Sequence, residues 1–144
     1  MNIADRLAIL DVIGKYAYTW DRKDVDGWLQ LFMDDGVWEA YQPGTTEPVV
    51  RIVSQPELRT YAEQSFTVRL AAVQTRHHQT DTVFVEIGPD RAMTETMVLV
   101  THQGAADAVP RLFLTGVYRD EWRKTEGGWQ FARRALYRDS TPRY

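Results

Sequence analysis

The spacing of apolar residues changes near residue 76 to strict alternation, and this change constrains the fold more than any other feature of the chain. From there to residue 138, apolar and polar side chains alternate, as they do in half-buried strands. The turn signals GPD at 88–90 and EGG at 126–128 indicate hairpins. The pattern predicts four long strands, at 76–87, 91–103, 111–124 and 128–138.

The beginning of the chain has a helical repeat instead. Asp21 lies at the edge of the apolar stripe of this predicted first helix, where a carboxylate can reach into whatever the helix covers. At about 100° per residue, the stripe itself holds Ile9, Ile13, Tyr16, Ala17 and Trp20.

Shorter elements are predicted between this helix and residue 75. Asp24 or Asp26 could cap a second short helix, because a side-chain oxygen at that position accepts from the free backbone N–H groups. SQPE at 54–57 has the form of a capping box, with Ser54 three residues before Glu57, and predicts a third helix after it. Two other segments have the pattern of short strands, at 37–41 and 49–53.

The order of the elements, helices first and a long antiparallel meander afterwards, predicts an α+β fold. The helices would pack on one face of a curved sheet. With 144 residues and no internal repeat, we expect one domain over residues 1–144. The glycine-rich phosphate loops of nucleotide-binding folds are absent.

Composition excludes several classes of function. The net charge is −3 with no basic stripe, so no nucleic-acid partner is expected. The chain has no cysteine, which excludes disulfides, thiolate metal sites and cysteine nucleophiles. No apolar run approaches membrane-spanning length, and MNIADRLAIL lacks a basic region before its apolar residues. We therefore expect no membrane partner, no signal peptide and a cytoplasmic location.

Two of the three histidines stand side by side in TRHHQTD, at residues 75–81. In a regular strand His77 and His78 point to opposite faces, so they cannot both bind one metal ion without a bulge. His102 lies in another predicted strand, and no HExxH motif is present. We expect no metal and no cofactor, while a metal-dependent enzyme that uses the three histidines stays open as an alternative.

Asp21 and His77 form a candidate acid–base pair. An aspartate that accepts from one imidazole nitrogen fixes the tautomer and stabilises the imidazolium formed when the other nitrogen takes a proton. Histidine suits this role because its ordinary pKa is near neutrality. The alternative is structural: Asp21 belongs to an exposed DRKD turn, and His77 is satisfied by a backbone carbonyl or by water.

The last predicted strand carries two adjacent arginines in WQFARRALYRD. Arg133 and Arg134 should point to opposite faces, Arg133 with Trp129 and Phe131, and Arg134 with Ala132. Both arginines could be solvated at a sheet edge. Alternatively, one lies inside, where a fixed cation could hold a leaving group or an enolate oxygen.

These features together resemble the SnoaL-like group of the nuclear transport factor 2-like superfamily. The resemblance implies a cone-shaped α+β barrel, in which a strongly curved antiparallel sheet wraps a pocket closed by N-terminal helices. The group includes dehydratases, a dehydrochlorinase and polyketide cyclases. The matching stretches cover nearly the whole chain: YAYTWDRKDVDGWLQLFMDDGVWE at 16–39, TRHHQTDTVFVEI at 75–87, and GVYRDEWRKTEGGWQFARR at 116–134.

The resemblance also implies catalytic residues. In dehydratase-type members, an Asp near the end of the first helix pairs with a His at the start of a central strand, and these fall on Asp21 and His77. The dehydratase tyrosine falls on Tyr16 in one alignment and on Trp20 in another. The dehydrochlorinase arginine falls on Arg134.

The chain departs from the group at two positions. Asp81 stands where relatives often have Asn, and beside His77 it could act as a second acid–base group. The second catalytic histidine of scytalone dehydratase falls near Thr96. The candidates for substrate binding are Trp20, Trp38, Asp81, Thr96 and Tyr118.

Our leading hypothesis is a cofactor-independent acid–base enzyme that acts on a small apolar or polycyclic molecule, by dehydratase-like elimination or by cyclisation or isomerisation. His77 would be the base and Asp21 its partner, while Tyr16 and Arg134 would hold the oxygen or leaving group. The rival hypothesis is a non-catalytic binding or scaffold subunit, such as the small subunit of a ring-hydroxylating dioxygenase. In either case the resemblance implies a homodimer or homotrimer.

Overall fold

The computed structural model describes residues 1–141 and contains the predicted elements in the predicted order. The largest difference in boundaries is at the first strand, which starts at Phe32 rather than at residue 37. The elements are α1 (Ile3–Asp21), α2 (Val25–Leu29), β1 (Phe32–Tyr41), β2 (Val50–Val53), α3 (Ser54–Gln64), the π-helical turn η1 (Ser65–Arg69), β3 (Val73–Ile87), β4 (Arg91–Gly104), β5 (Arg111–Thr125) and β6 (Gly128–Arg138).

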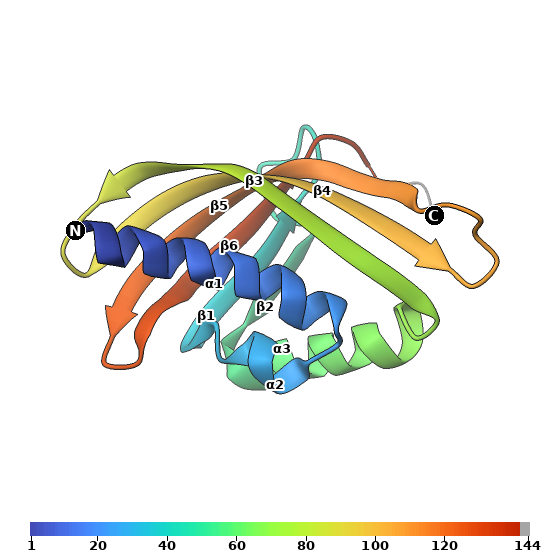
Figure 1. Ribbon diagram of the computed structural model, residues 1–144, viewed down its shortest axis with the longest axis horizontal. Helices are drawn as coiled ribbons and strands as arrows, with labels where there is room; N and C mark the ends of the chain where they lie inside the picture. The colour runs from blue at the N-terminus through green and yellow to red at the C-terminus, as the bar shows by residue number, and fades with distance from the viewer. Residues whose placement is uncertain (142–144) are drawn as a thin grey trace.

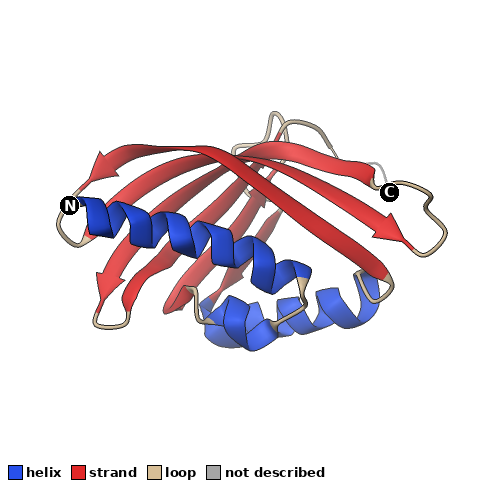
Figure 2. Cartoon of the chain, viewed as in Figure 1, coloured by secondary structure: helices blue, strands red, loops and turns tan. Residues whose placement is uncertain are grey.

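The six strands form one curved sheet in the order β2-β1-β6-β5-β4-β3, with the helices on its concave side (Figures 1 and 2). The α+β class is therefore confirmed. Two details differ from the expected antiparallel barrel. The sheet stays open, because β2 and β3 are its two edges, and β1 pairs with β6 in the parallel direction.

Helix α1 lies across the concave face of the sheet (Figure 1). Four residues of its predicted stripe, Ile9, Ile13, Tyr16 and Trp20, are buried, and the fifth, Ala17, is half-buried at the edge. The helix begins with a capping box that the sequence analysis did not predict: Asn2 Oδ1 accepts from the Asp5 backbone N–H at 3.0 Å, and Asp5 Oδ2 accepts from that of Asn2 at 3.4 Å. The cap fixes the start of α1, and the buried stripe packs the helix against the sheet.

Of the N-caps predicted for α2 and α3, the first is confirmed and the second is wrong. Asp24 caps α2, accepting from the Gly27 backbone N–H at 2.9 Å. The capping box predicted for SQPE is wrong, because the N-cap of α3 is Val53 and no side-chain cap bond forms. Glu57 nevertheless accepts from the Val53 N–H at 2.9 Å, which satisfies one of the free donors.

Strand β3 contains a bulge that reverses its faces. Its register to β4 shifts between Thr80 and Val83, and Asp81 takes a positive φ of 54°. Before the bulge His77 and Gln79 point inward, and after it Thr82 does. Simple alternation therefore fails from Asp81 onward, because an extra residue exchanges the two faces of a strand.

A second bulge lies in β6. The pairing with β5 runs from Trp122↔Phe131 directly to Glu121↔Arg133, so Ala132 is an extra residue. The expected grouping of Arg133 with Phe131 is consequently wrong. Arg134 shares the buried concave face with Phe131, and Arg133 points to the opposite face.

Within residues 1–141, none of the helices combines the length and apolar character needed to cross a membrane.

Candidate active site

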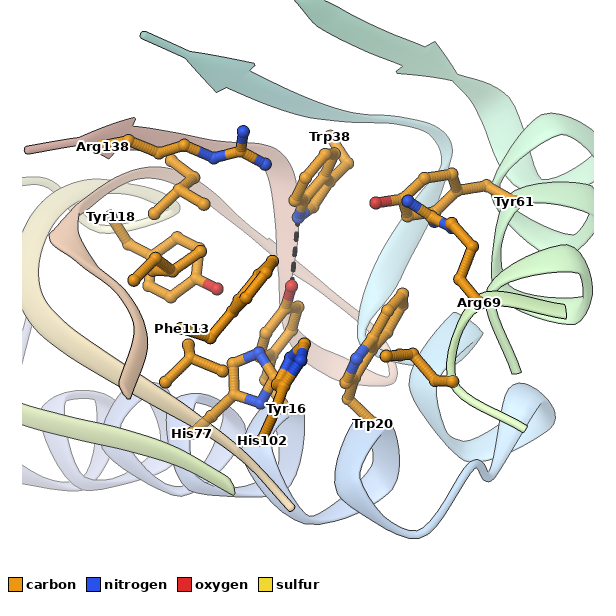
Figure 3. Close-up of a pocket in the computed structure, with 14 residues that line it drawn as sticks. Tyr16, Trp20, Trp38, Tyr61, Arg69, His77, His102, Phe113, Tyr118 and Arg138 are labelled. Atoms are coloured by element: carbon orange, nitrogen blue, oxygen red, sulfur yellow. Dashed lines mark hydrogen bonds between the residues drawn. The ribbon is translucent and has the colours of Figure 1, made fainter. Parts of the chain in front are cut away.

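A cavity of about 390 Å³ lies between the concave face of the sheet and the helices (Figure 3). This volume is within the usual range for small-molecule sites. Its walls are mostly aromatic and aliphatic, with two histidines and two arginines. The lining residues are Tyr16, Trp20, Trp38, Tyr61, Arg69, Leu70, His77, Val100, His102, Phe113, Leu114, Tyr118, Leu136 and Arg138.

His77 and Asp21 meet behind the wall of this cavity. Asp21 Oδ1 lies 2.7 Å from His77 Nδ1, and Asp21 Oδ2 accepts from the backbone N–H of His77 at 3.0 Å. Thr75 Oγ1 donates to Asp21 Oδ1 at 2.7 Å. His77 lines the cavity whereas Asp21 does not. With Nδ1 engaged by a carboxylate, Nε2 is the ring nitrogen left for a ligand.

The environment of Asp21 favours its ionised form. Burial alone would raise the pKa of this carboxyl, but the hydrogen bonds with His77 and Thr75 outweigh it and lower the pKa below its ordinary value. An ionised Asp21 accepts from Nδ1–H, so the neutral form of the His77 imidazole carries its proton on Nδ1 and has its ring lone pair on Nε2.

Tyr16 presents a hydroxyl group to the same cavity. Trp38 Nε1 donates to Tyr16 Oη at 3.0 Å (Figure 3), and the Tyr118 hydroxyl is a second hydrogen-bond neighbour of this oxygen. The Tyr16 O–H can still turn to donate to a ligand in the cavity. Its ring lies edge-on to the His77 ring, with centroids 6.1 Å apart. Burial raises the pKa of Tyr16 although the Arg134 charge opposes it, so the hydroxyl stays protonated at neutral pH.

Arg134 does not line the cavity, although the resemblance suggested a place beside the leaving group. It is fully buried, and its guanidinium carbon lies 3.9 Å from the Tyr16 ring centroid and 3.7 Å from that of Tyr118. It also donates to Gln79 Oε1, and Gln79 in turn donates to the Ile13 carbonyl at 2.9 Å. Arg134 thus packs behind the tyrosines and links the sheet to α1.

The counter-charge of Arg134 is the equally buried Asp120, with Oδ1 3.4 Å from Arg134 Nε. Among the described residues, neither carboxylate oxygen of Asp120 has a hydrogen-bond partner. Burial raises the pKa of Asp120 to about 7, although the charges of Arg134 and Arg133 lower it. This pair was not predicted, and the bulge in β6 explains why.

Two predicted binding residues lie away from the cavity. Asp81 is exposed at the β3 bulge, so the expectation that it stands beside His77 is wrong. Thr96 is fully buried in β4, with its hydroxyl 3.0 Å from that of Thr82, and it does not line the cavity.

The other predicted binding residues do line the cavity: Trp20, Trp38 and Tyr118. The sequence did not predict that Tyr61, Arg69 and Arg138 line the cavity, and it offered His102 only as a metal ligand. His102 stacks on Phe113 with centroids 3.9 Å apart, and burial lowers its pKa, as do the charges of His77 and Arg111. Only Arg138 could have been found from the sequence. It stands four residues after Arg134 in the same strand, and residues four apart in a strand point to the same face.

His78 lies on the opposite side of β3 from His77 and is exposed, as alternation predicted. The three histidines therefore do not converge. Throughout residues 1–141, no group of three His, Cys, Asp or Glu side chains is arranged to hold a metal ion.

An open curved sheet with helices on its concave side and a cavity between them is the cystatin-like fold, shared with solved structures at TM-scores near 0.79. Within that class, the chain belongs to the SnoaL-like domain family, whose model matches residues 1–135.

Solved structures with the same fold come from several bacteria. Rv3472 from Mycobacterium tuberculosis, a protein of unknown function, is 29% identical with a TM-score of 0.79, covering 94% of this chain and 72% of its own. A proposed aromatic ring hydroxylase from Novosphingobium aromaticivorans is 26% identical with a TM-score of 0.80, covering 98% and 93%. A proposed scytalone dehydratase from the same organism is 21% identical with a TM-score of 0.79, covering 99% and 90%. A comparison with curated proteins gave no significant match.

Proposed function

We propose that the chain is a cofactor-independent acid–base enzyme in which His77 Nε2 removes a proton from carbon. The observation that carries this proposal is the 2.7 Å contact between Asp21 Oδ1 and His77 Nδ1, made by an imidazole that lines an apolar cavity. A histidine held in this tautomer is a general base at neutral pH, and the nearby carboxylate stabilises the imidazolium that forms.

Tyr16 completes the proposed reaction. When His77 takes a proton from a carbon next to a carbonyl group, the electron pair moves onto the carbonyl oxygen as an enolate. The O–H of Tyr16 would donate a hydrogen bond to that oxygen as its charge develops. In an elimination, the enolate then expels a hydroxyl group from the neighbouring carbon, and the His77 imidazolium returns its proton so that water leaves.

The substrate class is proposed from the cavity walls. Aromatic rings from α1, β1, α3 and β5 line the cavity that His77 also lines, which suits a small cyclic or polycyclic molecule. The likeness to the proposed scytalone dehydratase supports elimination as the first choice among elimination, cyclisation and isomerisation.

The second candidate is a non-catalytic subunit, favoured by the likeness to the β subunit of a proposed aromatic-ring-hydroxylating dioxygenase, at 23% identity and a TM-score of 0.80. The convex sheet face would then form the assembly surface, and it exposes Met97 and Leu99. Analytical ultracentrifugation would test the homodimer or homotrimer that either candidate implies.

The enzyme proposal is tested with 2-tetralone, a bicyclic ketone with acidic protons next to its carbonyl group. Proton NMR in D₂O follows the exchange of those protons for deuterium. Wild-type protein should accelerate exchange, and His77→Ala should slow it roughly 100-fold or more. His78→Ala is the matched control, because His78 is exposed on the other side of the same strand. Equal rates for wild type and His77→Ala would reject His77 as the base.

A further inference from the structure

The charged groups in the cavity wall are all of one sign. Of the 14 lining residues, Arg69 and Arg138 carry guanidinium groups, and none is Asp or Glu. The proposed reaction uses His77 and Tyr16 and leaves both arginines without a role. An apolar cavity with fixed positive charge and no carboxylate in its wall favours a ligand that carries negative charge.

Arg138 differs from its neighbours in the sheet because its charge is not matched. Arg133 contacts Glu39 at 2.7 Å, and Arg134 lies 3.4 Å from Asp120. Arg138 makes no ion pair within residues 1–141, and its Nε is buried without a hydrogen-bond partner there. A guanidinium group is planar and binds an oxygen anion through parallel N–H groups, so a ligand could satisfy it.

Arg69 is already engaged. It donates to Ser65 Oγ, and its guanidinium carbon lies 5.0 Å from the Tyr61 ring centroid. It therefore contributes positive charge to the cavity wall, whereas the Arg138 Nε–H has no hydrogen-bond partner within residues 1–141.

The positions of the aromatic rings in the cavity wall indicate the shape of the ligand. Trp38 stacks on Tyr61 with ring centroids 5.3 Å apart. Figure 3 shows the Arg138 guanidinium near Trp38, on the side of the cavity away from His77, with Tyr118 between the two in the view. A flat ring lying among these aromatic groups would have one end at His77 and the other at Arg138.

We infer that the natural ligand is an aromatic acid, whose ring lies among the aromatic walls and whose carboxylate pairs with Arg138. The inference rests on the proposed function only in taking this cavity as the substrate site. It makes Arg138 the residue that determines specificity for the acid, at the end of the cavity opposite the proposed base.

The test compares naphthalene-2-carboxylate with its neutral isostere 2-naphthamide by isothermal titration calorimetry at pH 7.5. Wild-type protein should bind the acid about 10- to 100-fold more tightly than the amide, as expected for a charge-assisted hydrogen-bonded pair. Arg138→Gln should abolish that preference while amide affinity stays within about threefold, which also reports that the cavity is intact. Arg138→Lys should keep part of the preference.

Two further variants test whether the preference for the acid comes from Arg138 itself. Arg123→Gln, at an exposed position in β5, should leave the preference unchanged. His77→Ala should retain it, so that failure of the catalytic proposal is distinguishable from failure of this one. The assignment to Arg138 is overturned if wild-type protein binds both probes equally or binds neither. It is also overturned if Arg138→Gln keeps the preference for the acid, or if only Arg69→Gln loses that preference.

Discussion

Asp21 makes two hydrogen bonds with His77: its Oδ1 lies 2.7 Å from the ring Nδ1, and its Oδ2 accepts from the backbone N–H of the same residue at 3.0 Å. One carboxylate therefore fixes both the path of β3 and the orientation of the imidazole ring. The two residues are 56 positions apart, at the end of α1 and near the start of β3. The contact joins the helix layer to the sheet at the cavity wall.

Asp21→Asn should lower the proton-abstraction rate roughly 100-fold, because an amide neither fixes the tautomer nor balances the imidazolium. It should also lower the free energy of unfolding by about 1–3 kcal/mol at neutral pH, through weaker hydrogen bonds. The folded-state pKa of Asp21 is lowered, so its contribution is present above the ordinary Asp pKa of about 4 and is lost as the pH falls. Urea denaturation at pH 7 and pH 3 should show the stability gap closing at the lower pH; a constant gap would argue against an ionised Asp21.

Tyr16→Phe should reduce turnover roughly 10- to 1000-fold, because the developing enolate loses a hydrogen-bond donor. It should also cost about 1–3 kcal/mol of stability, since the buried Trp38 N–H loses its acceptor. Tyr18→Phe is the matched control on the same helix, because Tyr18 is 64% exposed. Kinetics on the 2-tetralone exchange reaction and thermal denaturation measure the two effects. If both variants behave alike, the Tyr16 hydroxyl has no special role.

The contribution of Asp120 to stability should change with pH in the opposite direction from that of Asp21. Burial raises the pKa of Asp120 to about 7, so between about pH 4 and pH 7 the folded state binds more protons than the unfolded state. The stability that this group contributes therefore falls as the pH rises through that window. The melting temperature of wild type minus that of Asp120→Asn should decrease from pH 4.5 to pH 7.5, with exposed Asp35→Asn showing no such trend. A difference that increases with pH would mean that Asp120 is ionised throughout.

Much of the fold is readable from the sequence because the two hydrophobic periods are strong. The stripe on α1 and the alternation of β3 to β6 are consequences of one-sided burial, which acts locally on each segment. The position of Asp21 at the edge of its stripe and the opposite directions of His77 and His78 follow from the same geometry. Pairing β1 with β6 requires contacts across about a hundred residues, and no local pattern encodes it.

The errors about Asp81 and about the faces of Arg133 and Arg134 have one physical source, the bulges. Each inserts a residue that reverses the faces of the strand beyond it, at Asp81 in β3 and at Ala132 in β6. Neither position carries glycine or proline, so the residue types do not indicate a bulge there. The first bulge takes Asp81 out of the site, and the second brings Arg134 onto the buried face beside Tyr118.

Whether His77 acts as a general base in the cavity can be measured with the elimination of 5-nitrobenzisoxazole. A base takes the ring C–H proton, the N–O bond breaks, and a coloured cyanophenolate forms, so the reaction needs no other catalytic group. We predict that His77→Ala lowers kcat/KM roughly 100-fold or more, while His78→Ala stays within about twofold of wild type. Equal kcat/KM values for wild type and His77→Ala would show that His77 is not a general base in this cavity.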